Sequence, residues 1–127
     1  MKVLIIQTAF IGDVILATPV ISELHRCQPG FTIDVLVRKG NESLLENFPG
    51  IRSVLVWDKR NSKTKQLLST LFKIRKEKYD IVINLQRFAS TGLLTALSSA
   101  KTRIGFDKNP FAFAFSKAIP HEIGEDN

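Results

Sequence analysis

The chain has 127 residues, of which 44 % are hydrophobic and 24 % are charged, and its formal net charge is +6. This size and balance predict one globular domain with a real core, and they exclude a disordered or fibrous protein. The lone cysteine, Cys27, excludes an intrachain disulfide framework and a multi-cysteine metal site, and it favours a reducing compartment. No run of about 18 apolar residues occurs, so the sequence predicts no membrane-spanning segment.

The stretch from residue 3 to residue 24 indicates the fold class. Four β-forming residues at positions 3–6 lead through a short loop, with Gly12 and Asp13, into an apolar helical segment. A fully buried strand that passes through a glycine-containing turn into a helix is typical of the start of a doubly wound α/β domain. Ligands bind at the carboxyl ends of the strands in such sheets, and this connection brings Asp13 there.

The rest of the chain continues to alternate between strands and helices. Further strands are predicted at residues 31–37, 53–57, 80–85 and 102–105. Helices are predicted at residues 13–27, 42–47, 65–78 and 91–99. Such alternation implies right-handed crossovers and a parallel sheet, for which we expect the strand order 3-2-1-4-5.

Two of the predicted helices are amphipathic. In the first, the inward face is expected to carry Val14, Leu16 or Ala17, Val20 or Ile21, and Leu24. Pro19 is expected to kink this helix, unless a second helical piece begins at Thr18. In the helix at residues 65–78, the side chains expected to point inward are Leu67, Leu68, Leu71, Phe72 and Ile74.

The segment after Phe106 allows two interpretations. Phe111, Phe113 and Phe115 alternate with alanines, which indicates a strand or an extended apolar segment. The alternative is an exposed aromatic surface that a partner domain or a membrane covers. No closing element is expected after it, so we interpret the chain as a piece of something longer.

The positive charge is concentrated in one region. Residues 59–78 hold eight basic residues and one acidic residue, so this segment carries +7 and the remainder of the chain −1. One interpretation is a solvated helix face with its flanking loop. The other is a surface that binds phosphates, carboxylates or anionic lipid headgroups.

Asp13 is the leading candidate for chemistry, and it has two possible roles. As a helix N-cap, its charge would be stabilised by the helix dipole. As a general base, it would accept a proton from a substrate hydroxyl during attack on an electrophile. The sequence has no Gly-x-Gly-x-x-Gly pattern, which argues against dinucleotide binding at the start of this helix.

Other candidates follow from the expected strand order. Gln86 and Arg87 end the fourth predicted strand and would face the same crevice as Asp13, where the arginine can bind a carboxylate or phosphate. Thr8 and Gln7 can donate hydrogen bonds to a ligand or to the loop backbone. His25 and His121 lack partners at ligand spacing and are interpreted as surface residues, so no metal site is expected.

Two segments resemble a known family. The opening FIGDVILATPVISEL is similar to the amino-terminal signature of the ADP-heptose:lipopolysaccharide heptosyltransferases, glycosyltransferase family 9. The segment YDIVINLQRFASTGLLTALSSAKTRIGFDK resembles the family's Asp-x-Gln-Gly strand end, small-residue helix and Arg-Ile-Gly strand. Where the family commonly has Asp-x-Gln-Gly, this chain has Asn84-Leu85-Gln86-Arg87. It also has Ser90-Thr91 where the family commonly has a basic residue and a serine.

The resemblance implies a function as well as a fold. It implies the amino-terminal, Rossmann-like acceptor domain of a two-domain GT-B glycosyltransferase, residues 1–127, without the domain that binds ADP-heptose. Asp13 would deprotonate a hydroxyl of a lipid A–Kdo or heptosylated core acceptor, which attacks the anomeric carbon with inversion. Acceptor contacts would come from Thr8, Gly12, Lys59, Arg60, Gln86 and Arg87.

The same resemblance sets further expectations. ADP-heptose is the donor substrate, and no cofactor is expected. The enzyme would work in the cytoplasm, with peripheral contact at the inner face of the cytoplasmic membrane, and the isolated chain would be inactive. The competing hypothesis is a non-catalytic α/β binding module with Asp13 as a helix cap. Nucleic-acid binding is not expected, because the basic segment lacks interleaved aromatic residues.

Overall fold

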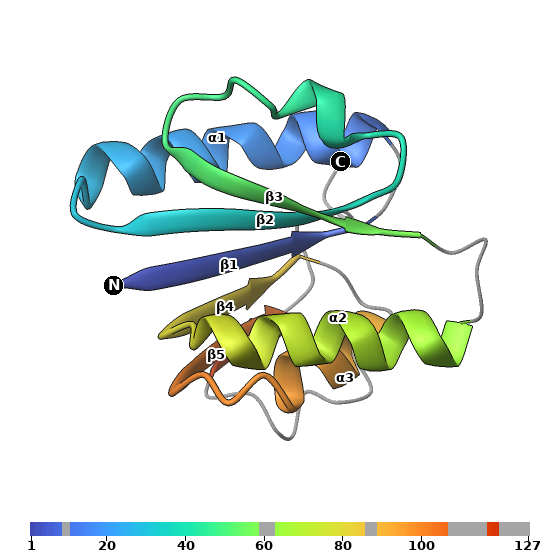
Figure 1. Cartoon of the computed structure of the whole chain (residues 1–127). Coiled ribbons are helices and arrows are strands. Elements are labelled where there is room, and N and C mark those ends of the chain that lie inside the picture. The colour runs from blue at the N-terminus through green and yellow to red at the C-terminus, as the bar shows by residue number, and fades with distance from the viewer. Residues whose placement is uncertain (9–10, 59–62, 86–88, 107–116, 120–127) are drawn as a thin grey trace.

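A computed structural model describes residues 1–8, 11–58, 63–85, 89–106 and 117–119 of the chain. One parallel sheet lies between two layers of helices (Figure 1). The strands are β1 (Lys2–Gln7), β2 (Thr32–Arg38), β3 (Ile51–Trp57), β4 (Ile81–Asn84), β5 (Thr102–Phe106) and β6 (Lys117–Ile119). The helices are α1 (Ile11–Cys27), the 3₁₀ helix η1 (Glu42–Leu44), α2 (Lys63–Glu77) and α3 (Ala89–Ala96).

The sheet has the order β3-β2-β1-β4-β5-β6, and all of its neighbours are parallel. The predicted order of the first five strands is confirmed. The sixth strand was not predicted: β6 pairs with β5, with Ile104 opposite Lys117. The alternating aromatic segment at residues 111–115 lies outside the described residues.

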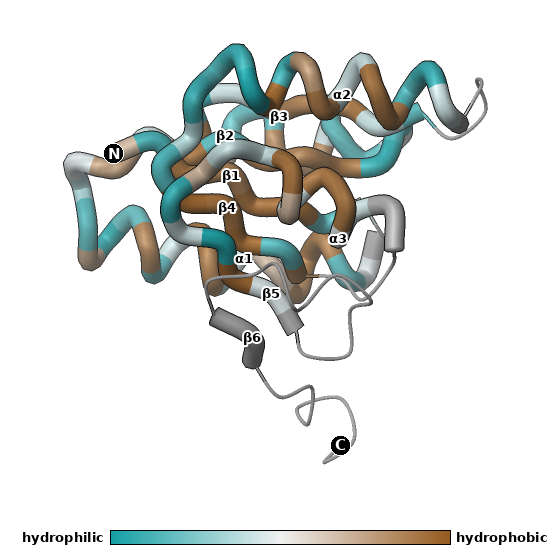
Figure 2. Tube along the Cα trace, turned by 90° about the horizontal axis from the view of Figure 1, so that it is seen from below, coloured by the Kyte–Doolittle hydropathy of each residue, from teal (hydrophilic) through white to brown (hydrophobic). Residues whose placement is uncertain are grey.

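The central strands are buried on both faces because helices cover both. On one side, Val3 and Ile5 of β1 belong to a cluster with Val14 and Ile21 of α1. On the other side, Leu4 and Ile6 pack in a second cluster that includes Ile74 of α2 and Leu94 of α3. Figure 2 shows the hydrophobic strands enclosed between these layers. Alternate residues of a strand point to opposite faces, so one continuous apolar run supplies both cores.

Helix α1 runs without interruption through Pro19, so the alternative of a second helical piece that begins at Thr18 is wrong. Proline has no N–H, and the carbonyl of Ile15, four residues earlier, loses its usual donor. The Thr18 hydroxyl donates to that carbonyl at 2.6 Å instead. The neighbouring side chain therefore replaces the hydrogen bond that proline removes.

The structure decides which residues of α1 face inward at the two positions that the sequence left open, Leu16 or Ala17 and Val20 or Ile21. Ala17 and Ile21 are buried with Val14, whereas Leu16 and Val20 are 75 % and 41 % exposed. The helix predicted at residues 42–47 is only the short η1. Helix α3 begins and ends earlier than the predicted 91–99.

The prediction for α2 is wrong at two positions. Leu68 and Phe72 were expected to point inward, but they are 61 % and 71 % exposed. Thr70 is buried instead, at 4 % exposure, together with Ile74. A helix with more apolar residues than one face holds must expose some of them, and the sequence pattern does not decide which.

Candidate functional site

The candidate site lies where the direction of strand addition reverses. The chain passes from β1 to β2 and β3 on one side, then returns to place β4 on the other side of β1. The connections after β1 and β4 therefore leave the same edge of the sheet and diverge. In open α/β sheets this switch point is where a ligand-binding crevice forms, outside the carboxyl ends of the strands.

Asp13 is the ionisable residue that α1 brings to this edge. It is the third residue of α1, in the first turn, and its side chain is exposed. The hypothesis that Asp13 is the N-cap residue is wrong, because α1 already begins at Ile11, two residues before Asp13. Among the described residues, the Asp13 carboxylate has no hydrogen-bond or ion-pair partner. The group is therefore accessible, and the helix dipole favours its negative charge.

The other candidates from the first loop differ from each other. Thr8 is only 1 % exposed and makes an interaction within the chain, so its side chain lies beneath the surface. Gly12 is exposed, and a side-chain carbon added there would meet no atom of the described residues within 4 Å. The space beside Gly12 is therefore open, which leaves the backbone next to Asp13 accessible.

Sequence reasoning missed one polar residue at this edge. Asn84, the last residue of β4, pairs with Ile6 of β1 and is 1 % exposed. Gln7, 8 % exposed, ends β1 beside it. A polar residue that ends an otherwise apolar strand was the available signal, because a buried amide must be satisfied by its surroundings. Asn84 pairs with Ile6 and so faces the α2 side of the sheet, whereas Gln7, the next residue of β1, faces the α1 side.

Four of the predicted acceptor contacts, Lys59, Arg60, Gln86 and Arg87, lie outside the described residues. His121 does as well, whereas His25 is half-buried and its ring fills the space at Gly50. His25 therefore lies at the surface with part of its ring packed against Gly50. Within the described ranges, no group of three or more His, Cys, Asp or Glu residues could hold a metal ion.

A second ionisable cluster occupies the opposite edge of the sheet. Asp34 of β2 is 1 % exposed and accepts from Arg52 Nε at 3.0 Å and from the Tyr79 hydroxyl at 2.6 Å. Arg52 Nη2 also donates to Glu77 Oε2 at 2.9 Å, and Lys2 Nζ reaches the same carboxylate at 3.1 Å. Each carboxylate in this cluster has a cationic partner.

The cluster changes the titration of its members. Burial, and then the hydrogen bond to Asp34, raise the pKa of Tyr79 far above its ordinary value. Hydrogen bonds from Arg52 and Lys2 lower the pKa of Glu77. The cluster consists of satisfied pairs at the amino ends of the strands, and we assign it a structural role.

The fold and this edge define a Rossmann-like α/β domain with an exposed carboxylate near its switch point. No family model matches the sequence. The chain is 30 % identical over 119 residues to lipopolysaccharide heptosyltransferase 3 of Escherichia coli. This match covers 90 % of this chain and 35 % of the relative.

Solved structures of glycosyltransferases are also similar to this chain. A glycosyl transferase family 9 protein from Veillonella parvula has a TM-score of 0.81 at 26 % identity, over 93 % of this chain and 35 % of that one. E. coli heptosyltransferase WaaC with ADP-2-deoxy-2-fluoro heptose has a TM-score of 0.80 at 19 % identity, which supports the fold alone. That match covers 94 % of this chain and 42 % of WaaC.

The chain matches the lipopolysaccharide heptosyltransferases of glycosyltransferase family 9 in both sequence and fold. The resemblance and the Rossmann-like α/β fold inferred from the sequence are thereby confirmed. The chain spans about a third of the length of the curated relatives it matches. Within the residues that the structure describes, no helix has the length and apolarity to cross a bilayer.

Proposed function

We propose that this chain is the acceptor-binding domain of an inverting glycosyltransferase that moves heptose from ADP-heptose to the inner core of lipopolysaccharide. Asp13 is its general base. The observation that carries the proposal is the exposed Asp13 carboxylate, which has no partner among the described residues and follows β1 at the switch point. The relatives' names supply the class of reaction.

The chemistry needs one ionised carboxylate within reach of the acceptor. Asp13 accepts the proton of an acceptor hydroxyl as that oxygen attacks the anomeric carbon of the donor sugar. The new carbon–oxygen bond forms on the face opposite the leaving group, and the bond to the diphosphate breaks. ADP leaves with the electron pair, and the configuration at the anomeric carbon inverts.

The proposed acceptor contacts come from connections that follow three strands. Thr8 and Gly12 follow β1, Lys59 and Arg60 follow β3, and Gln86 and Arg87 follow β4. Parallel strands end at the same edge, so these connections begin on the side of the sheet where Asp13 lies. Basic side chains there suit an acidic sugar acceptor such as lipid A–Kdo or a heptosylated core.

The donor site belongs to a part of the enzyme outside these 127 residues. Because the chain spans about a third of its relatives, we infer that ADP-heptose binds to a second domain and that the isolated chain does not turn over. No cofactor is proposed beyond the donor substrate. We place the enzyme in the cytoplasm, in peripheral contact with the inner face of the cytoplasmic membrane, where a lipid-linked acceptor is presented.

The test joins the chain to a donor-binding domain of the family and measures heptose transfer from ADP-heptose to a lipid A–Kdo acceptor. Asp13→Asn keeps the size and removes the base, so the rate is expected to fall about 10²- to 10⁴-fold. Glu23→Gln is the matched control, because Glu23 is an exposed carboxylate farther along α1, paired with Arg26. The control is expected to keep the parental rate.

Two results would contradict the proposal. If Asp13→Asn transfers heptose at the parental rate, Asp13 is not the base, and the binding-module hypothesis gains support. If the 127-residue chain alone transfers heptose, the assignment of the donor site to a second domain is wrong.

A further inference from the structure

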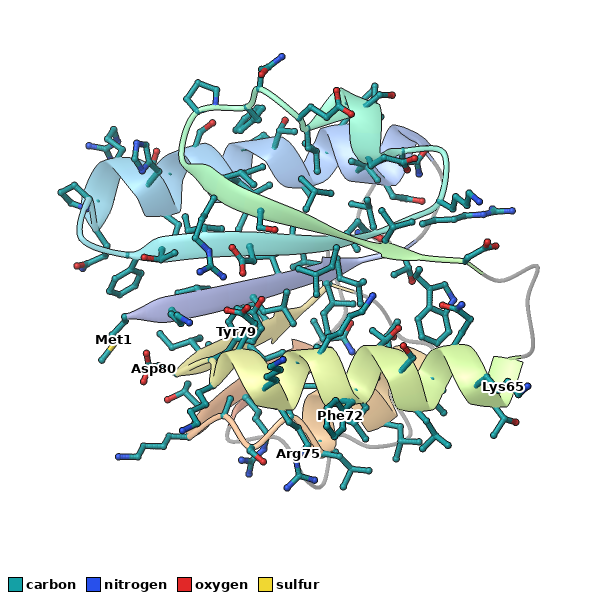
Figure 3. All side chains as sticks on the ribbon, in the orientation of Figure 1. Met1, Lys65, Phe72, Arg75, Tyr79 and Asp80 are labelled. Atoms are coloured by element: carbon teal, nitrogen blue, oxygen red, sulfur yellow. The ribbon has the colours of Figure 1, made fainter. Side chains whose placement is uncertain are left out.

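Helix α2 carries a stripe of apolar and basic side chains on its outer side. Leu68 and Phe72 are the exposed apolar residues, at 61 % and 71 % exposure, and Lys65, Arg75 and Lys76 are exposed beside them. These positions are three or four residues apart, so they share one face of the helix. Figure 3 shows Phe72 and Arg75 on the side of α2 that faces away from the sheet.

This stripe lies opposite the face that packs into the core. Thr70 and Ile74 are buried against the sheet, and the helical repeat turns Phe72 and Lys76 to the other side. An open groove of about 730 Å³ follows the stripe and is lined by Leu68, Leu71, Phe72, Arg75 and Lys76. The outer face therefore combines apolar side chains that nothing among the described residues covers with cations at both ends.

The charge of this face is uncompensated on α2. Glu77 is the one acidic residue of the helix, and it points the other way, paired with Arg52 at 2.9 Å and Lys2 at 3.1 Å. The cations on or next to the outer side of α2 are all exposed: Lys65, Lys73, Arg75, Lys76 and Lys78. The face is therefore complementary to a negatively charged surface.

We propose that this outer face of α2 docks on an anionic lipid surface. The helix lies parallel to the surface, Leu68 and Phe72 enter the headgroup–acyl boundary, and the basic side chains contact lipid phosphates. Interfacial helices combine a basic face with apolar side chains of this kind. Lysine and arginine suit the position because their aliphatic stems cover apolar surface while their charges stay in water.

The apolar residues favour lipid over nucleic acid as the occupant. Single-stranded nucleic acid is bound by several aromatic side chains on which successive bases stack, in a basic groove. Here one aromatic residue, Phe72, stands beside a leucine, which offers no π-face. Leu68 and Phe72 lie one helical turn apart, a spacing that suits insertion of both into the same lipid layer.

The docking mode has a consequence for the site, and this step rests on the proposed function. Helices α1 and α2 lie on opposite faces of the sheet and both begin at its carboxyl edge (Figure 1). A surface that contacts α2 along its length also borders that edge. Docking would leave that edge, with the Asp13 carboxylate, uncovered at the side of the docked domain, open to a lipid-linked acceptor.

The test measures co-sedimentation of the 127-residue chain with vesicles of phosphatidylethanolamine and phosphatidylglycerol, and with vesicles of phosphatidylcholine alone. We expect binding to the anionic vesicles that weakens as salt is raised. The double variant Leu68→Gln/Phe72→Gln should lose roughly tenfold in partitioning because both inserted side chains become polar. Glutamine favours helix and both sites are exposed, so circular dichroism should report an unchanged fold.

Leu16→Gln is the matched control. Leu16 is also an exposed leucine on a helix, at 75 % exposure, but its neighbours on that helix include the carboxylates Asp13 and Glu23. This variant is expected to bind the anionic vesicles as the parent does. Charge reversal at Lys73 and Lys76 should reduce binding to anionic vesicles and leave the phosphatidylcholine result unchanged.

Equal binding to both vesicle types, or a double variant that sediments like the parent, would overturn the proposal. So would capture of a single-stranded RNA, in the absence of vesicle binding, that the same double substitution abolishes. The assay uses neither ADP-heptose nor a donor-binding domain, so its outcome is separate from that of the transfer assay.

Discussion

The two edges of the sheet use carboxylates in opposite ways. At the amino edge, Asp34 is buried and accepts from Arg52 and Tyr79, and Glu77 is held by Arg52 and Lys2. At the carboxyl edge, Asp13 is exposed and has no partner within the described part of the chain. A carboxylate whose oxygens are saturated by donors stabilises the fold, whereas one that faces solvent remains available to a ligand.

The difference follows from the topology. Each helix packs across the sheet and ends at the amino edge, where the next strand begins. The end of α2 therefore places Glu77 and Tyr79 near β2, where the Tyr79 hydroxyl donates to Asp34. At the other edge the connections diverge from the switch point, and Asp13 in the first turn of α1 is exposed. Substitutions at the two edges should therefore separate stability from activity.

The largest expected effect on stability is at Asp34. Asp34→Ala leaves the Tyr79 hydroxyl buried without its acceptor and removes one of the two carboxylates that Arg52 contacts. Each hydrogen bond to a charged acceptor contributes about 1.5–3 kcal/mol, and Asp34→Ala loses those from both Tyr79 and Arg52, so the free energy of unfolding in urea should fall by about 3 kcal/mol or more. Glu23→Ala, which breaks an exposed pair with Arg26, should change it by less than about 1 kcal/mol. Equal losses in the two variants would contradict a structural role for the amino edge.

Tyr79→Phe should have the next largest effect. It removes one hydrogen bond to a charged acceptor and should lower the free energy of unfolding by about 1.5–3 kcal/mol at neutral pH. The carboxylate keeps Arg52, so the loss should be smaller than in Asp34→Ala. The measurement is again urea unfolding, and an unchanged midpoint would show that the hydroxyl contributes nothing.

The same variant tests the raised pKa of Tyr79, and the sign can be worked out. Burial and the hydrogen bond to Asp34 favour the neutral phenol, so the folded state holds its proton to higher pH than the unfolded state does. The stabilisation is complete below the unfolded pKa of about 10 and declines above it, by about 1.4 kcal/mol per pH unit. Tyr79 is the only tyrosine in the sequence. The alkaline decline of the parent should therefore be steeper than that of Tyr79→Phe, and parallel curves would contradict the shift.

The fold was largely predictable because the buried strands contain continuous runs of apolar residues in the sequence. Residues 3–6 and 35–37 are such runs, and glycine or proline separates the elements between residues 27 and 51. Once strands alternate with helices, the handedness of the crossovers leaves few strand orders to consider. Strand β6 was missed because Lys117–Ile119 is too short to show a period, and its pairing with β5 depends on tertiary context.

The side-chain arrangement was less predictable. Leu68 and Phe72 lie in the same helical pattern as Leu67 and Leu71, and only packing against the sheet decides which pair is exposed. The contact between Tyr79 and Asp34 joins residues 45 apart in sequence, so it depends on strand register that the pattern does not specify. The place of Asp13 at the carboxyl edge follows from the topology, because it lies in the first turn of the helix after β1, and its role as the base stays a prediction.

The smallest expected effect on stability is at Asp13 itself. Asp13→Ala removes a carboxylate from the first turn of α1, where the helix dipole stabilises a negative charge by about 0.3–1 kcal/mol, and introduces a residue that favours helix by up to about 0.7 kcal/mol. The two contributions offset each other, so the urea midpoint should stay close to that of the parent. A free energy of unfolding lowered by about 2 kcal/mol or more would mean that Asp13 supports the fold as Asp34 does. The contrast between the edges would then fail, because a loss of transfer in Asp13 variants could reflect unfolding rather than a missing base.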